Sequence, residues 1–143
     1  MSRACTLGLD LGTSSAKAVV LDTEGRVLAQ ASAGYPVTSA AAGYAESDPA
    51  DWWAAVSACA REAVAAAGDA AAARAAGTRT AGVRPVAIGL SGQMHGLVMT
   101  SADGRALRPA LLWADSRATG ALRAYRQLPR PALDRLANPL APG

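Results

Sequence analysis

Phenylalanine is absent from this 143-residue sequence, and aromatic residues make up only 4% of it. Apolar residues still account for 51%, and most of them are alanine, leucine and valine. A chain of this length predicts one domain, which buries roughly 70% of the surface that the unfolded chain exposes. Because large rings are scarce, we expect a core of small, tightly layered side chains.

Other scarcities exclude whole classes of function. Cys5 and Cys59 are the only cysteines, and they form no CxxC pattern, so we expect buried, reduced thiols and a reducing compartment. No apolar run approaches the ~18 residues of a membrane helix, and the start lacks the apolar stretch of a signal peptide. The net charge of +3 comes mostly from scattered arginines without interleaved aromatics, which argues against nucleic-acid binding. We therefore expect a cytoplasmic protein that binds neither nucleic acid nor membrane.

Three early runs, at positions 5–10, 16–22 and 26–34, are apolar or β-branched enough to form strands. Tight turns join them, and Gly25 can take the positive φ that a hairpin demands. These runs predict an antiparallel meander. Positions 85–92 form the clearest later strand, and an intervening helix makes that strand parallel to an earlier one.

That intervening helix is indicated by Asp48 as its N-cap and Gly68 as its end. Apolar residues repeat at helical spacing from Trp52, so we expect one face to lie on the sheet, with Trp52 and Trp53 as core anchors. Residues 65–83, rich in alanine and glycine, fit a frayed extension of the helix or a solvent loop. The expected fold is α/β, with a mixed sheet in the order βββαβ.

The segment DLGTSSAK, residues 10–17, joins the first two expected strands. Successive backbone N–H groups in such a turn can form an anion-binding concavity, for which phosphate is the natural guest. Asp10 could hold Mg²⁺ through water, and Lys17, the only lysine, could bring positive charge toward the phosphates. The candidate phosphate ligands are Gly12, Thr13, Ser14, Ser15 and Lys17. An ordinary hairpin with a capping aspartate fits the spacing equally well, and the pattern is neither a Walker A loop nor a dinucleotide fingerprint.

The segment GQMHG, residues 92–96, contains the only histidine of the chain. It follows an expected strand, and ligand clefts of α/β proteins open at strand ends. Gln93 and His95 could hydrogen-bond the hydroxyls of a polyol while Met94 packs against its carbon atoms. The alternative is a structural histidine that has nothing to do with a ligand.

Four segments together resemble the carbohydrate kinases of the FGGY family. They are LGLDLGTSSAKAVVLDTEGRVLA, ESDPADWW, IGLSGQMHG and LRPALLWADSRA, in the order and approximate spacing found at the start of such kinases. The resemblance covers nearly the whole chain, and the QMHG element is similar to that of xylulokinases. It implies an RNase H-like fold, like that of actin and the Hsp70 ATPase domain, with ATP and sugar held between two lobes.

By this resemblance Asp10 lies beside the Mg²⁺–ATP phosphates, residues 12–15 form the first phosphate loop, and Met94 and His95 contact the sugar. The WADSR segment, with Trp113, Asp115 and Arg117, is similar to a family segment near the sugar site; an N-cap and a surface charge would explain its Asp and Arg equally well. Glycerol kinases carry an Arg-Glu pair at the position of QMHG, which argues against glycerol as substrate.

The resemblance implies phosphorylation of the 5-hydroxyl of D-xylulose, with ATP and Mg as cofactors. Other sugars that the family phosphorylates (gluconate, ribulose or an alditol) remain alternatives, as does a non-catalytic sugar- or nucleotide-binding lobe; a nucleotide switch of the actin type would leave QMHG unexplained. Family members continue into a second lobe with the adenine site and an aspartate proposed as general base. We expect residues 1–143 to be the N-terminal part of the first lobe, inactive by itself, from an enzyme that could be a homodimer.

Overall fold

The computed structural model describes residues 3–74 and 82–135. Contacts divide the chain into two compact units, and each is considered by itself. The first unit consists of Met1–Pro36 and Asp48–Met94, and the second of Val37–Ser47 and His95–Gly143. None of the helices in the described ranges combines the length and apolar character needed to span a membrane.

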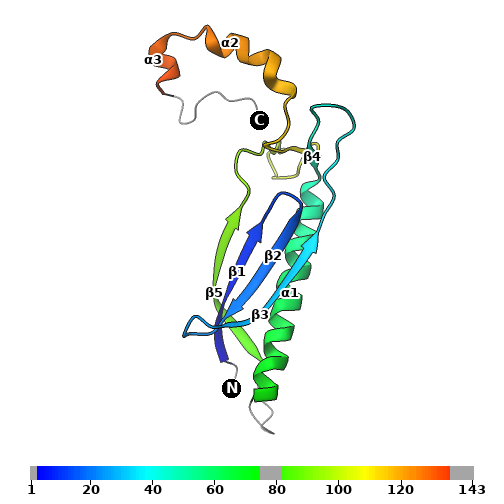
Figure 1. Ribbon diagram of the computed structural model, residues 1–143, viewed down its shortest axis with the longest axis vertical. Coiled ribbons are helices and arrows are strands. Elements are labelled where there is room, and N and C mark those ends of the chain that lie inside the picture. Colours follow the sequence, from blue (N-terminus) through cyan, green and yellow to red (C-terminus); the bar gives the residue numbers. More distant parts are fainter. Residues whose placement is uncertain (1–2, 75–81, 136–143) are drawn as a thin grey trace. The chain divides into compact units, whose positions relative to one another are not determined.

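A four-stranded sheet forms the first unit (Figure 1). Its strands are β1 (Arg3–Leu11), β2 (Ser15–Leu21), β3 (Val27–Gly34) and β5 (Val83–Gly92), in the spatial order β3-β2-β1-β5. β2 is antiparallel to both β1 and β3, whereas β5 is parallel to β1. Gly25, in the turn between β2 and β3, has a φ of 79°. The meander and the βββαβ order of this sheet are therefore confirmed.

One long helix, α1 (Pro49–Arg74), packs on the sheet, mainly against β2 and β3. The Asp48 carboxylate accepts a hydrogen bond from the Ala50 N–H at 2.8 Å, which confirms the expected N-cap. The expected end at Gly68 is wrong, because alanines of high helix propensity flank this glycine and continue the buried stripe to Ala71. Residues 65–74 are thus a helical extension, and residues 75–81 lie outside the described ranges.

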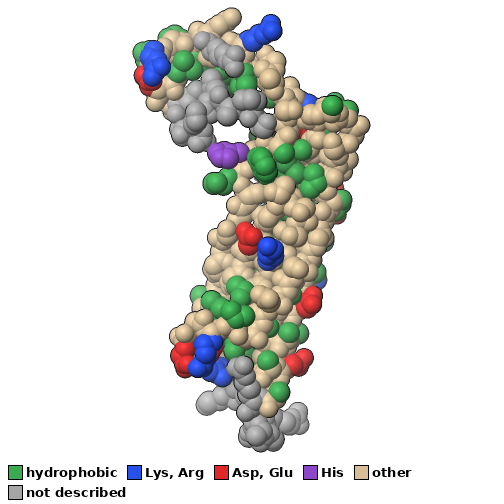
Figure 2. Space-filling view, in the orientation of Figure 1, with side chains coloured by type: hydrophobic (Ala, Val, Ile, Leu, Met, Phe, Trp, Pro, Cys, Tyr) green, Lys and Arg blue, Asp and Glu red, His purple; other side chains and the backbone are tan. Residues whose placement is uncertain are grey.

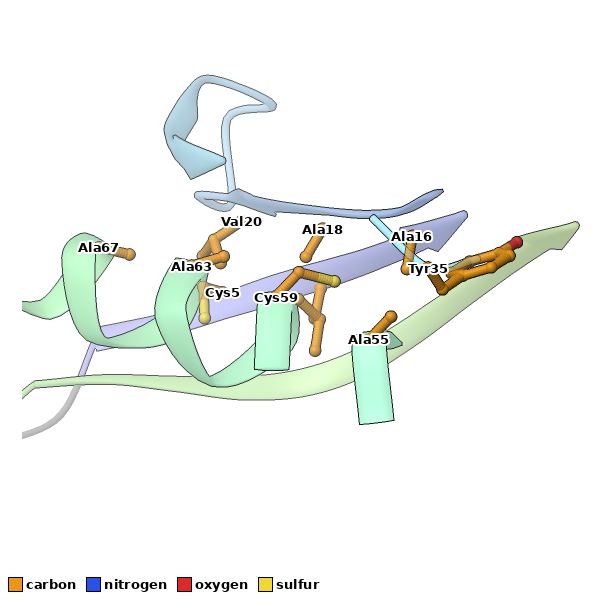
Figure 3. Close-up of a cluster of buried hydrophobic side chains, with 10 residues drawn as sticks. Cys5, Ala16, Ala18, Val20, Tyr35, Ala55, Cys59, Ala63 and Ala67 are labelled. Carbon is orange, nitrogen blue, oxygen red and sulfur yellow. The ribbon is translucent and has the colours of Figure 1, made fainter. Parts of the chain in front are cut away.

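The core between α1 and the sheet is built from small side chains, as expected (Figure 3). The largest fully buried side chains are Val20, Cys5 and Cys59. Both cysteines are free, and burial raises the pKa of each thiol. Of the two tryptophans expected as core anchors, Trp52 packs against the cluster, but Trp53 is 74% exposed. Trp53 projects about 100° around the helix from Trp52, on the side away from the buried Ala55, and this places it outside the buried stripe.

Short elements make up the second unit. A two-stranded sheet pairs β4 (Glu46–Ser47) with β6 (Ala110–Leu111), and isolated bridges join Thr38 to Glu46 and Leu97 to Leu111. Three short helical segments follow, a 3₁₀ helix η1 (Arg117–Ala121), α2 (Leu122–Arg126) and α3 (Arg130–Leu133). The first of them, η1, begins two residues after Asp115 and is followed directly by α2.

Candidate functional site

Asp10 and Lys17 lie opposite each other on β1 and β2, as antiparallel partners. Partner residues of neighbouring strands project on the same face, so both side chains lie on the face away from α1. There the two residues help to line an open hollow of about 810 Å³ together with Ser32 and Ser91. The structure thus brings together a carboxylate, an amine and hydroxyls on one face of the first unit.

The turn from Gly12 to Ser15 is closed by a hydrogen bond from the Gly12 N–H to the Ser15 carbonyl at 3.0 Å. A side chain at Gly12 would place its Cβ only 3.1 Å from that carbonyl, so the turn favours glycine there. Tyr35 donates twice to the turn: its N–H bonds the Ser14 carbonyl at 3.0 Å, and its hydroxyl bonds the Gly12 carbonyl. Three carbonyl oxygens of the turn are therefore engaged by protein donors, which reduces their repulsion of an anion.

Tyr35 is a site residue that the sequence reasoning missed. It is 8% exposed, and burial, followed by the nearby charge of Asp10, raises the pKa of its phenol. Knowledge of the strand register would have indicated it, because Ser15 pairs with Gly34 and the Tyr35 N–H bonds the Ser14 carbonyl one position further out. A bulge in the β2–β3 ladder between Val20 and Leu21 hides this count from sequence alone.

Gln93 and Met94 differ sharply in their surroundings. The Gln93 N–H bonds the Leu11 carbonyl at 2.8 Å, which ties the end of β5 to the end of β1. Both amide atoms of its side chain are covered, and neither has a hydrogen-bond partner among the described residues. The Met94 side chain, by contrast, is exposed.

His95 lies at the surface and has an unusual backbone. Its φ of 61° is in the left-handed region, and within the described ranges no other non-glycine residue has a positive φ. Figure 2 shows this imidazole, the purple side chain, exposed. Strained backbone of this kind persists only where neighbouring structure holds it, and it clusters at ligand sites. The exposed imidazole is available to a ligand.

The Asp115 carboxylate accepts a hydrogen bond at 3.1 Å from the N–H of Arg117, the first residue of η1, which is a capping contact, whereas Arg117 is not a loose surface charge. Arg117 Nε lies 2.9 Å from Asp115 Oδ2, and its Nη2 donates to both Asp115 and Glu46. The guanidinium also stacks on the ring of Tyr44, with Cζ 3.8 Å from the centroid. Ser116, the residue directly before η1, makes no side-chain cap hydrogen bond.

Hydrogen bonds from Arg117, followed by the N–H of Ala45, hold the pKa of the Asp115 carboxyl well below its usual range. The same bonds to Asp115 and Glu46 raise the pKa of the Arg117 guanidinium. Trp113, two residues before Asp115, is half-exposed. Both charged groups are thus committed to protein partners, and of the WADSR candidates Trp113 presents the most surface to a ligand.

Asp10 is the candidate for a metal contact, and its setting fits Mg²⁺. Within residues 3–74 and 82–135, no three His, Cys, Asp or Glu residues come together as a metal cluster. Mg²⁺ does not need such a cluster, because it keeps several waters and is held by one or two carboxylates together with substrate phosphates. The single carboxylate of Asp10, beside the 12–15 turn, is compatible with that kind of site.

Comparison with known proteins identifies the family of the chain. The family model described as "FGGY family of carbohydrate kinases, N-terminal domain" matches residues 5–132. The chain belongs to the FGGY family of carbohydrate kinases. It is 37% identical over 113 residues to a xylulose kinase of Bacillus subtilis, a match that covers 79% of this chain and 20% of that protein. The chain therefore spans about a fifth of the length of this curated relative.

Solved structures of FGGY kinases share the fold. A xylulose kinase from Rhodospirillum rubrum, 28% identical, matches with a TM-score of 0.77 over 90% of this chain and 24% of its own. A gluconate kinase from Lactobacillus acidophilus, 29% identical, matches with a TM-score of 0.68 over 87% and 23%. The expected α/β fold of the RNase H-like first lobe is therefore confirmed.

Proposed function

We propose that this FGGY domain is the first part of an ATP-dependent kinase that phosphorylates the 5-hydroxyl of D-xylulose. The observation that supports the kinase assignment is the turn at residues 12–15. Asp10 lies just before this turn, and Tyr35 donates hydrogen bonds to two of its carbonyl oxygens. The sugar assignment rests on QMHG and on the name of the relatives, which are xylulose kinases.

In this proposal the backbone of residues 12–15 cradles the ATP phosphates, and Lys17 brings positive charge from the neighbouring strand. Asp10 would hold Mg²⁺ through water, and the bound metal would supply charge neutralisation at the phosphate oxygens. Phosphoryl transfer depends mainly on such positioning and charge stabilisation, because the protein has little covalent chemistry to perform. His95 donates to or accepts from a sugar hydroxyl, and Met94 packs on the sugar carbons.

Gluconate is the second candidate substrate, since a gluconate kinase shares this fold at similar identity. The test uses a complete kinase that carries residues 1–143 of this sequence as its first domain. ADP release is measured with D-xylulose, gluconate, ribulose, an alditol and glycerol. The highest kcat/KM with D-xylulose supports the proposal, and the highest value with another sugar refutes the substrate.

Asp10→Asn in that enzyme tests the kinase assignment. It should lower kcat on the order of 10²-fold while the Kd for xylulose stays nearly unchanged, because the lost charge acts on metal and phosphates. Asp69→Asn, at an exposed position of α1, is the matched control and should be silent. An unchanged kcat in Asp10→Asn would remove this carboxylate from the reaction. Mg²⁺ dependence, a cytoplasmic location and a homodimer stay predictions.

A further inference from the structure

Four residues of the second unit form a connected cluster, which we call the Arg117 clamp: Tyr44, Glu46, Asp115 and Arg117. The guanidinium is at its centre, stacked on Tyr44 and hydrogen-bonded to both carboxylates. The Asp115 side chain is 5% exposed and also accepts from the Ala45 N–H at 3.0 Å. The clamp therefore fastens the segment before β4 to the loop after β6.

β6 connects this clamp to His95. On one side β6 pairs with β4, with Glu46 opposite Leu111. On the other side Leu97 and Leu111 exchange two backbone hydrogen bonds, of 2.8 and 3.0 Å. Leu97 stands two residues beyond His95, so this pair is the nearest backbone anchor on the C-terminal side of the left-handed residue. Contacts that hold β6 in place therefore also restrain the backbone close to His95.

The anchor is weak by itself. A strand of two residues offers few ladder hydrogen bonds, and isolated strand pairs are marginal in water. The left-handed backbone of His95 adds strain that the surrounding structure must hold. Charged, bidentate and stacked contacts of an arginine are the kind that hold a fixed geometry. The Arg117 clamp supplies the fixed geometry that the few hydrogen bonds of the two-residue strands do not provide.

We propose that Arg117 is a positioning residue for His95, acting through Asp115, Glu46 and β6. This rests on the proposed function in one respect, namely that His95 is the group whose position matters for the sugar. The geometric claim itself concerns only the second unit.

Arg108 provides a matched control, because it donates to the same Glu46 oxygen as Arg117 does. Its side chain is 42% exposed, against 26% for Arg117, and it makes neither the Asp115 nor the Tyr44 contact. Arg108→Ala and Arg117→Ala each remove one positively charged partner of the Glu46 carboxylate. Only the second removes the clamp.

The test is nuclear magnetic resonance on the isotopically labelled 143-residue chain, in which the single histidine gives unambiguous His95 signals. In Arg117→Ala we expect the His95 resonances to broaden or shift, and the Leu97 and Leu111 amides to exchange about tenfold faster. In Arg108→Ala we expect exchange within about twofold of wild type, as for a surface ion pair. Protection of the Leu7 and Val20 amides checks that the first unit is folded.

Equal effects of the two substitutions, or an unchanged His95 in Arg117→Ala, would overturn the proposal. If Arg117→Ala abolishes all protection in the second unit, including the Gly104 amide in the 101–105 turn, Arg117→Lys decides. That variant keeps the charge but loses the planar fork. A displaced His95 with an intact Gly104 amide supports the clamp, and wild-type His95 signals refute it.

These measurements need no sugar, so they separate the clamp from the substrate assignment. A displaced His95 in Arg117→Ala, together with a sugar KM that ignores His95→Ala, would leave the clamp standing and refute the role of His95 in sugar binding. An unchanged His95 in Arg117→Ala, with a sugar KM that does depend on His95, would refute the clamp alone.

Discussion

Replacing Tyr35 with phenylalanine removes the hydroxyl that bonds the 12–15 turn. That hydroxyl donates to the Gly12 carbonyl, and the side chain is 8% exposed, so water does not readily take its place. Leaving a buried acceptor without its donor costs on the order of 1–3 kcal/mol, whereas a typical net hydrogen bond is worth about 1 kcal/mol. We expect Tyr35→Phe to lower the free energy of unfolding of the first unit by about 1–2 kcal/mol.

Urea unfolding, with amide exchange at Gly12, measures this loss, and Tyr125→Phe is the control because its side chain is exposed. The control should stay within about 0.5 kcal/mol of wild type. Burial and Asp10 raise the pKa of the Tyr35 phenol. The contribution of the phenol is therefore complete below its unfolded pKa near 10 and is lost as the pH rises through the higher folded value.

In a complete kinase Tyr35→Phe should raise the KM for ATP and leave the KM for the sugar unchanged, because the hydroxyl that is lost bonds the Gly12 carbonyl of the 12–15 turn. A stability loss equal to that of Tyr125→Phe, or faster Gly12 exchange in neither variant, would refute the role of Tyr35 as a support of the turn. An equal rise of both KM values would show a general loss of structure.

Three further outcomes follow from the same contacts. Arg117 holds the pKa of the Asp115 carboxyl below its usual range. The ionised Asp115 therefore stabilises the folded chain fully above the unfolded carboxyl pKa near 4, and this stabilisation is lost on further acidification. Thermal unfolding of wild type and of Asp115→Asn should accordingly diverge above about pH 4 and converge below it. Gly8→Ala puts a Cβ 2.9 Å from Val19 Cγ1 and should destabilise by about 1–3 kcal/mol in urea, whereas Gly89→Ala, paired with Gly8 in β5, meets nothing within 4 Å and should be neutral. Leu90 on β5 is 80% exposed, so sedimentation should show concentration-dependent self-association that Leu90→Ser reduces.

The first unit was largely predictable because its signals are local. Apolar and β-branched runs marked β1 and β2, Gly25 marked the hairpin between β2 and β3, and Asp48 marked the start of α1. The error at Gly68 arose because a glycine inside an alanine-rich helix costs only about 1 kcal/mol, which the buried stripe through Ala71 offsets.

The supports of the site were not predictable, because their partners are distant in sequence. Tyr35 reaches Gly12 across 23 residues, and Arg117 reaches Glu46 across 71. A strand of two residues has no periodicity to detect, so β4 left no trace in the sequence. The motifs named Asp10, His95 and Asp115, but only the fold shows that Asp115 is engaged by protein while His95 is exposed.

The most direct test of the central claim is the effect of His95→Ala on the two Michaelis constants of a complete kinase carrying this domain. The account predicts that the KM for D-xylulose rises by about tenfold or more while the KM for ATP is unchanged, since one hydrogen bond in a desolvated site is worth on the order of 1–3 kcal/mol. Equal changes in both constants, or no change in the KM for D-xylulose, would contradict the assignment of the QMHG segment to the sugar.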